Sequence, residues 1–188
     1  MLNNKLIVQF LLRETIPPKS KEKDRIYDAV FKAHRDVLSG RFYLPNYCNS
    51  KNGSNENSLV IVLYKYITEK KLCNNNMPAK SSDLICYLCK KFPNVEFGAI
   101  QKLVNMTLKY LVCLYEFDKP IFRGYKIDSI GYDCPIDSNI LNKLGTKHTV
   151  WTKMDKKEYL CVQKEIHNKL IENGHDGGNL LFDLINWN

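Results

Sequence analysis

The chain has 188 residues, of which 44% are hydrophobic, and its 28 basic and 20 acidic side chains give a formal net charge of +8. A chain of this size and composition can bury a core, so a fold that depends on disulfides is excluded. No apolar stretch approaches the roughly 20 residues that span a bilayer, and the first residues do not resemble a signal peptide. We therefore expect no membrane partner.

The positive charge favours a polyanionic partner, because each phosphate that a lysine or arginine neutralises releases condensed counterions. Nucleic acid is the first such partner. Between Lys143 and Lys169 the sequence has seven lysines and three acidic residues, so much of the excess lies there. The alternative is a lysine-rich surface that only interacts with water. Seven scattered cysteines, an odd number, are typical of reduced thiols and predict a cytoplasmic location.

Apolar side chains recur at spacings of three and four through most of the chain, which predicts an all-α fold. In chain order we expect helices near 2–13, 21–38, 58–71, 81–92, 99–116, 138–144, 153–173 and 178–187. Pro17-Pro18, Ser39-Gly40 and Asn173-Gly174 are typical helix ends, and Ser81, Ser82 and Asp83 supply capping side chains before Leu84.

Polar and glycine-rich stretches predict loops at 49–55 and 73–76. Residues 117–136 break the helical spacing, so we expect an irregular insertion there, with room for a short hairpin.

The expected helix 99–116 follows Gly98 and carries one polar stripe formed by Lys102, Asn105 and Lys109, at positions i, i+3 and i+7. Periodicity alone is typical of a solvated face. Lys102, however, falls in the first expected turn, where unpaired N–H groups and the helix dipole attract phosphate. This position favours a functional role for Lys102.

A second segment, Cys134 to Gly145, introduces the expected helix 138–144 through Pro135 and Asp137. An aspartate in this position can cap the helix, and that role alone accounts for it. Pro135 keeps the chain before the cap extended. Capping and a catalytic role for Asp137 are compatible.

These two segments resemble the core of the helix-hairpin-helix DNA glycosylases, whose hairpin runs Gly-Val-Gly-Arg-Lys-Thr-Ala-Asn and whose catalytic segment runs Pro-Val-Asp-Thr-His. The matching positions are Gly98, Lys102, Asn105, Leu108, Tyr110, Pro135, Asp137 and Leu144-Gly145. The resemblance covers about 82–145, a third of the chain. It implies one catalytic unit over 1–188, built from two packed helical lobes with double-stranded DNA bound across the cleft by a monomer.

The resemblance also implies a chemistry, in which a base is flipped out of the duplex and excised. Lys102 is then the nucleophile at C1′ and Asp137 its carboxylate partner, and a Schiff base permits strand cleavage as a lyase. Gly98, Gln101, Asn105 and Lys109 are the expected DNA contacts. Base-excision repair and defence against phage DNA with modified bases are both consistent with this chemistry, and no cofactor is expected.

Three features depart from the family pattern. Ile100 replaces the second hairpin glycine, Asn139 replaces the usual histidine, and Lys102 and Asp137 are 137 − 102 = 35 positions apart, more than in the commonest members. The cysteine cluster of some relatives is missing after Asp137, so no iron–sulfur cluster is expected. The pair Cys86 and Cys89 falls within a helix without a second pair, so we expect no metal site.

The sequence gives little indication of which base would be the target. By analogy with related enzymes, the aromatic residues Trp151, Phe182 and Trp187, with Asp183, are candidates for a base pocket, and core packing is the alternative for each. Oxidised purines and modified cytosines are both possible targets. Two other functions stay open: a non-catalytic helical nucleic-acid-binding module, and an interaction protein of the toxin or phage-defence type whose charge is incidental.

Overall fold

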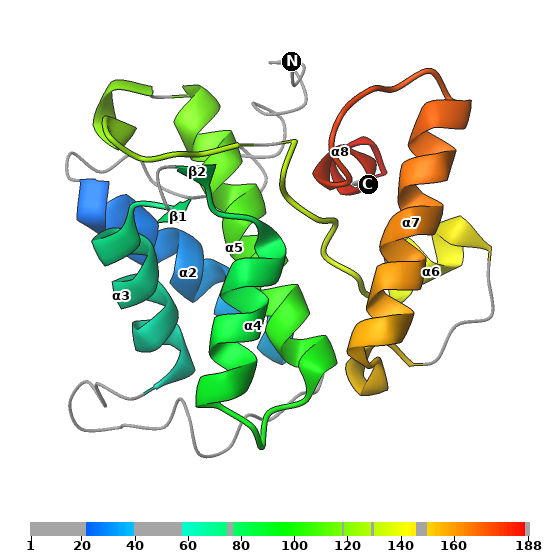
Figure 1. Ribbon diagram of the computed structural model, residues 1–188, viewed down its shortest axis with the longest axis horizontal. Coiled ribbons are helices and arrows are strands. Elements are labelled where there is room, and N and C mark those ends of the chain that lie inside the picture. The colour runs from blue at the N-terminus through cyan, green and yellow to red at the C-terminus, as the bar shows by residue number, and fades with distance from the viewer. Residues whose placement is uncertain are drawn as a thin grey trace.

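The computed structural model describes residues 22–39, 58–74, 77–117, 119–128, 130–145 and 150–186. Within these ranges the fold is all-α, as predicted, apart from one short strand pair (Figure 1). The α-helices are α2 (Glu22–Ser39), α3 (Leu59–Lys70), α4 (Ser81–Lys91), α5 (Phe97–Phe117), α6 (Ser138–Leu144), α7 (Lys156–Glu172) and α8 (Leu180–Ile185). The 3-10 helices are η1 (Lys119–Phe122) and η2 (Trp151–Lys153), and β1 (Cys73–Asn74) pairs antiparallel with β2 (Met77–Pro78).

Most predicted helices are confirmed within a few residues of their bounds, and α6 is confirmed at both ends. The predicted helix 2–13, its end at Pro17-Pro18 and the loop 49–55 lie outside the described residues. The predicted loop 73–76 was wrong in part, because its first two residues, Cys73 and Asn74, form β1 and pair with β2. Among the described residues of the insertion 117–136 there is no hairpin; η1 and an extended segment form it instead.

The start of α7 and the capping residue of α4 differ from prediction. Helix α7 begins at Lys156 because Asp155 caps it: the Asp155 carboxylate accepts the Glu158 N–H at 2.8 Å, and Glu158 accepts the Asp155 N–H at 3.0 Å. At α4 the serines lie within the first turn, and Asp83 supplies the cap by accepting the Lys80 N–H at 3.0 Å. In both helices a short-range carboxylate bond decides the boundary.

Helix α5 is the centre of the molecule, and every residue from Gly98 to Leu114 is buried. Helices α2 and α4, together with η1 and η2, pack around it. A helix that is buried on all sides has no solvated face. The polar stripe of Lys102, Asn105 and Lys109 therefore points into the protein, in contrast to the interpretation from periodicity.

Figure 1 shows two groups of helices, α2 to α5 on one side and α6 to α8 on the other. The chain after η1 crosses the top of the view and then descends between the two groups as the extended segment 132–137. This segment carries Asp137 to the start of α6. No helix in the described ranges is both long and apolar enough to cross a membrane.

Candidate functional site

Two glutamine side chains hold the extended segment 132–137 in place. Gln101 of α5 donates from Nε2 to the Ile136 carbonyl at 2.8 Å and accepts the Ile136 N–H at 3.2 Å. Gln163 of α7 does the same for Cys134, with distances of 2.7 and 3.1 Å. Buried backbone groups require hydrogen-bond partners, and here amide side chains replace a neighbouring strand. These bonds fix the register of the segment against both helices.

This register brings Lys102 and Asp137 together. Gln101 bonds to Ile136, and the next residue after each of them is Lys102 and Asp137, respectively. The Lys102 Nζ lies 3.3 Å from the Asp137 Oδ2. The other carboxylate oxygen, Oδ1, accepts the N–H groups of Asn139 at 2.9 Å and Ile140 at 3.0 Å. Asp137 therefore caps α6 with one oxygen and faces the lysine with the other.

Trp151 of η2 covers the lysine. The Lys102 Nζ lies 4.7 Å from the centroid of the Trp151 ring, within the range of a cation–π contact. Lys102 and Asp137 keep 11% and 24% of their side-chain surfaces exposed. The ion pair is thus largely desolvated, yet solvent still reaches its edge.

Gly98 permits this arrangement by its lack of a side chain. A Cβ at Gly98 would lie 2.1 Å from the Trp151 carbonyl oxygen and 2.8 Å from that of Thr152. Because α5 begins at Phe97, Gly98 is a buried helical residue, and Lys102 lies in the second turn. The expected turn glycine is therefore a site of close packing, and the expectation that Lys102 lies in the first turn was wrong.

The expected DNA contacts other than Gly98 have no exposed surface. Gln101, Asn105 and Lys109 are each 0% exposed, and all three bond to protein groups. The Asn105 Nδ2 donates to the Tyr159 hydroxyl at 2.9 Å, and that hydroxyl donates to Asp133 at 2.7 Å. Burial raises the pKa values of Tyr159 and Asp133. In this conformation these side chains hold the protein together and cannot touch a duplex.

A second lysine–aspartate pair lies deeper than the first. The Lys109 Nζ is 2.6 Å from the Asp183 Oδ2, with 0% and 7% of the two side chains exposed, and it ties α5 to α8. Burial raises the pKa of Asp183, and the Lys109 ammonium opposes that rise. Asp183 therefore holds α8 against α5 through its ion pair with Lys109. The sequence had placed it in a base pocket instead.

The remaining candidates for the base pocket lie in different parts of the protein. Trp151 lies against the Lys102–Asp137 pair. Phe182 instead lines a pocket of about 520 Å³ between α6, α7 and α8, together with Lys143, Lys169 and His175. Trp187 lies outside the described residues. Of the described candidates, Trp151 is the one in contact with the lysine.

Sequence reasoning missed three residues that build the site, namely Asp133, Tyr159 and Gln163. A signal was present for Gln163, since it falls on the buried stripe of α7 that Tyr159, Val162, Ile166 and Leu170 form. A polar side chain on an apolar helix face requires a partner and could have been flagged on that ground. Its partner, a backbone segment about 30 positions away, has no sequence signal.

The described residues contain no cluster of side chains that could hold a metal ion. No three histidine, cysteine or acidic side chains come together there. Cys86 is exposed and Cys89 half-buried on α4, and both are free thiols.

Comparisons of the chain with models of known families, with curated proteins and with solved structures find no match. The functional argument therefore rests on the residues and on their geometry.

Proposed function

We propose that this protein is a DNA glycosylase, with Lys102 as its nucleophile and Asp137 as the carboxylate partner. The observation that carries the proposal is the 3.3 Å contact between these two side chains, which are 35 positions apart and come together at a solvent-accessible edge. The sequence resemblance names the same two residues for excision of a flipped base. Double-stranded DNA carrying a damaged or modified base is the proposed substrate.

In the proposed reaction, Lys102 attacks as the neutral amine. Its ammonium proton first passes to a base, and the Asp137 Oδ2 is the adjacent acceptor. The new bond joins the lysine nitrogen to C1′ of the flipped nucleotide. The glycosidic C–N bond breaks, and its electron pair leaves with the base, which takes up a proton. The proton that the base takes up is the one that Asp137 accepted, so Asp137 returns to its carboxylate form and stabilises the positive charge that develops on the sugar.

Strand cleavage can follow from the same intermediate. Opening of the sugar ring turns the lysine–sugar adduct into a Schiff base, which makes a C2′ proton acidic. Removal of that proton and departure of the 3′ phosphate break the strand by β-elimination. Hydrolysis of the Schiff base then restores the amine of Lys102. The same enzyme would thus act as a lyase.

Trp151 orients the nucleophile in this proposal. The indole packs over the ammonium and limits the directions in which Lys102 can point. Such a contact stabilises a cation by about 0.5–2 kcal/mol, depending on how far it is desolvated. Contacts with the DNA backbone come from exposed lysines on neighbouring elements, such as Lys143 of α6 and Lys153 of η2.

Borohydride trapping tests the proposal directly, because it reduces a Schiff base to a stable protein–DNA adduct. We expect an adduct with the wild-type protein and none with Lys102→Ala. Lys119→Ala is the matched control, since Lys119 is 59% exposed beyond the far end of α5. Genomic DNA containing different modified bases serves as substrate, and mass spectrometry identifies the free base. Equal adduct in Lys102→Ala and wild type would disprove the assignment.

A non-catalytic nucleic-acid-binding module is the second candidate. The observation that favours it is that Lys102 is paired, stacked and 11% exposed, so a structural role is sufficient to account for it. This candidate predicts salt-dependent binding of DNA without release of any base. An interaction protein with incidental charge predicts that added DNA changes neither stability nor association.

A further inference from the structure

One buried amide connects the neighbour of Lys102 in the chain with the neighbour of Asp137. Gln101 is 0% exposed, and its side chain accepts the Ile136 N–H at 3.2 Å and donates to the Ile136 carbonyl at 2.8 Å. That carbonyl belongs to the peptide group that joins Ile136 to Asp137. Because a peptide group is planar, the bond from Gln101 fixes the plane that ends at the Asp137 Cα.

Asn105 lies one turn further along α5 and orients the Gln101 amide. The Asn105 Nδ2 lies 3.4 Å from the Gln101 Oε1 and donates to the Tyr159 hydroxyl at 2.9 Å. An amide nitrogen only donates, so this contact keeps the Gln101 oxygen on the side of Asn105 and leaves Nε2 for the Ile136 carbonyl. All of these groups are buried. Water therefore cannot replace the bonds of Gln101 if its amide is removed.

Gln163 of α7 makes the same pair of bonds to Cys134, three positions before Asp137. Its Oε1 accepts from the Asn179 Nδ2 at 3.0 Å, in the way that the Gln101 Oε1 faces Asn105. Gln163, however, ties the segment 132–137 to a helix that does not carry Lys102. Of the two glutamines, Gln101 is thus the one that connects the backbone at Asp137 with the helix of the nucleophile.

We propose that Gln101 is a positioning residue for the reaction, because it sets the distance between the Lys102 amine and the Asp137 carboxylate. This inference rests on the proposed function, in which a proton passes between these groups across 3.3 Å. Gln101 acts through the backbone of Ile136 and touches no substrate, in contrast to the DNA contact that the family resemblance implies. A misplacement of about 1 Å at a reacting centre lowers a rate by about a hundredfold.

Gln101→Met and Gln163→Met are a matched pair of variants. Methionine is unbranched like glutamine, and its thioether is at most a weak acceptor, so each variant loses two buried bonds to the segment. We expect similar losses of stability, measured as the urea midpoint. The kcat of base release is expected to fall about tenfold to a hundredfold in Gln101→Met, with KM for DNA unchanged, and much less in Gln163→Met. A DNA contact at Gln101 would raise KM instead.

Gln101→Asn is a milder variant for the case that Gln101→Met does not fold. It keeps an amide on a side chain that is one methylene shorter, so part of the bonding remains while Ile136 is displaced. The fall in kcat is expected in the same direction, again with KM unchanged.

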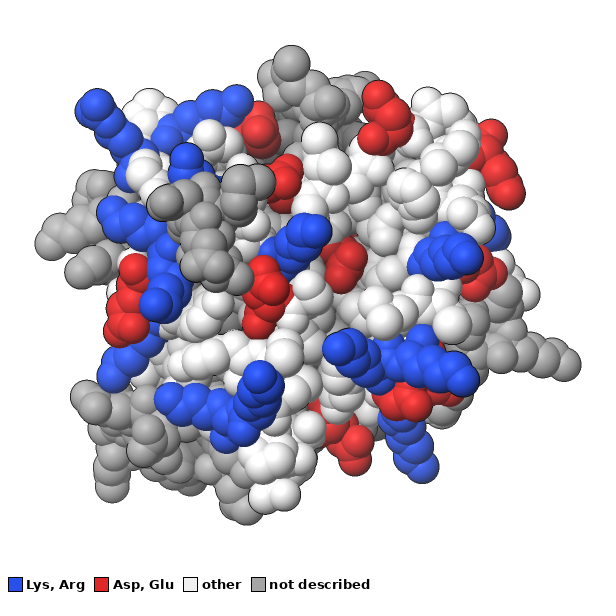
Figure 2. Space-filling model, viewed as in Figure 1, with Lys and Arg blue, Asp and Glu red and all other residues white. Residues whose placement is uncertain are grey.

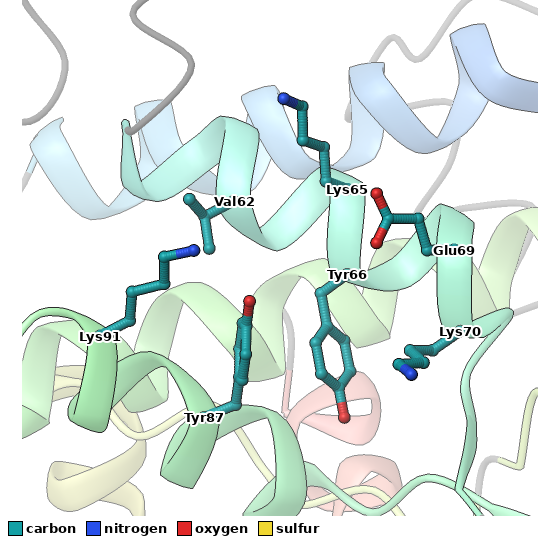
Figure 3. A pocket seen from close by; sticks show the side chains of 7 residues that line it. All are labelled: Val62, Lys65, Tyr66, Glu69, Lys70, Tyr87 and Lys91. Carbon is teal, nitrogen blue, oxygen red and sulfur yellow. The ribbon is translucent and has the colours of Figure 1, made fainter.

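Labelling of lysines with acetic anhydride tests the placement in the protein without DNA. The Lys102 side chain is 11% exposed and paired, so it is expected to react slowly in the wild type and severalfold faster in Gln101→Met. Lys109, which is 0% exposed, reports opening of the whole fold. Exposed Lys70, which lines a pocket of about 260 Å³ between α3 and α4, is the reference for an accessible amine (Figure 3).

Two results would overturn the proposal. One is an equal acceleration of labelling at Lys102 and Lys109, or an equal rate at Lys102 in the two methionine variants, because either shows a structural role alone. The other is a wild-type kcat in folded Gln101→Met. A wild-type protein that excises no base would instead remove the glycosylase function, and the labelling rates would still decide whether Gln101 places the two side chains.

Discussion

The two oxygens of Asp137 have separate partners, and this division makes the two roles of the residue separable by substitution. Oδ1 accepts two N–H groups at the start of α6, while Oδ2 faces the Lys102 ammonium. An asparagine retains an oxygen for the cap and loses the negative charge. An alanine loses both.

Asp137→Asn is therefore expected to keep the cap of α6 and the affinity for DNA while it loses base excision. Asparagine and aspartate are similar N-caps, whereas alanine there costs about 1 kcal/mol. Loss of a positioned carboxylate lowers excision on the order of a hundredfold or more. Urea denaturation of both variants and a base-release assay measure these effects. Full excision by Asp137→Asn would remove the carboxylate from the mechanism.

His34 gives the stability of the protein a dependence on pH. This side chain is buried on α2 beside the Phe31 ring, and burial lowers its pKa below the ordinary value of 6.5. The unfolded chain then binds the proton more readily than the folded chain does. Stability is complete above pH 6.5 and is lost as the pH falls from there toward the lowered pKa.

The variant His34→Gln tests this dependence on pH. In the wild type the free energy of unfolding is expected to decline just below pH 6.5, and in His34→Gln this decline is expected to be smaller. Denaturant titrations at closely spaced pH values measure it. Exposed His167 on α7 provides the control variant His167→Gln, for which the wild-type decline is expected to persist. An unchanged decline in His34→Gln would assign it to other groups.

Helix α5 and the 3-10 helix η2 approach each other at Gly98, and this contact positions Trp151 over Lys102. The two other supports of the site, Gln101 and Gln163, act on the segment 132–137 between α5 and α7. The geometry of the Lys102–Asp137 pair thus depends on how three separate elements pack. A single added methyl group at their contact is expected to disturb it.

Gly98→Ala places a Cβ 2.1 Å from a backbone oxygen, so η2 must move or α5 must bend. Overpacking of this kind costs about 1–3 kcal/mol or more. The control is Gly174→Ala, where φ is +76° and nothing lies within 4 Å of the added Cβ. Its expected cost of about 1–2 kcal/mol arises from backbone conformation alone. Gly98→Ala should also reduce borohydride trapping, and Gly174→Ala should not.

On the face of the molecule that Figure 2 draws, the basic side chains do not form one continuous patch. In the view of Figure 2 they gather over α3 and α4 and near the lower end of α7, with acidic side chains between them. A polyanion could therefore meet basic side chains at more than one place on this face, in keeping with the net charge of +8. Several phosphate contacts at once are consistent with this distribution.

Affinity for duplex DNA is expected to fall as salt rises. A plot of the logarithm of the binding constant against that of salt concentration should be linear, with a slope of about −0.9 for each phosphate contacted. Lys143→Ala and Lys153→Ala should each make the slope shallower by about one unit if these lysines touch the backbone. Binding that does not change with salt would contradict a role for the net charge.

The sequence by itself determined the helices. Apolar spacing over α3, α4, α5 and α7 is a local property, and it sets where a helix must bury a face. The start of α6 was also predictable, because an Asp137 cap involves N–H groups two and three positions away. The pairing of Lys102 with Asp137 was proposed from a resemblance to a known family, and spacing alone does not predict it.

Only the tertiary structure decided which way the polar side chains of α5 point. Periodicity is typical of a solvated stripe, whereas Gln101, Asn105 and Lys109 are buried because segment 132–137 and α8 cover them. Asn105 also bonds to Gln101, but the groups of segment 132–137, α7 and α8 that these side chains contact lie 29 or more positions away, and nothing in the local sequence selects them. The apolar spacing of a helix shows that one of its faces must be buried. Which segment covers that face depends on how the whole chain packs.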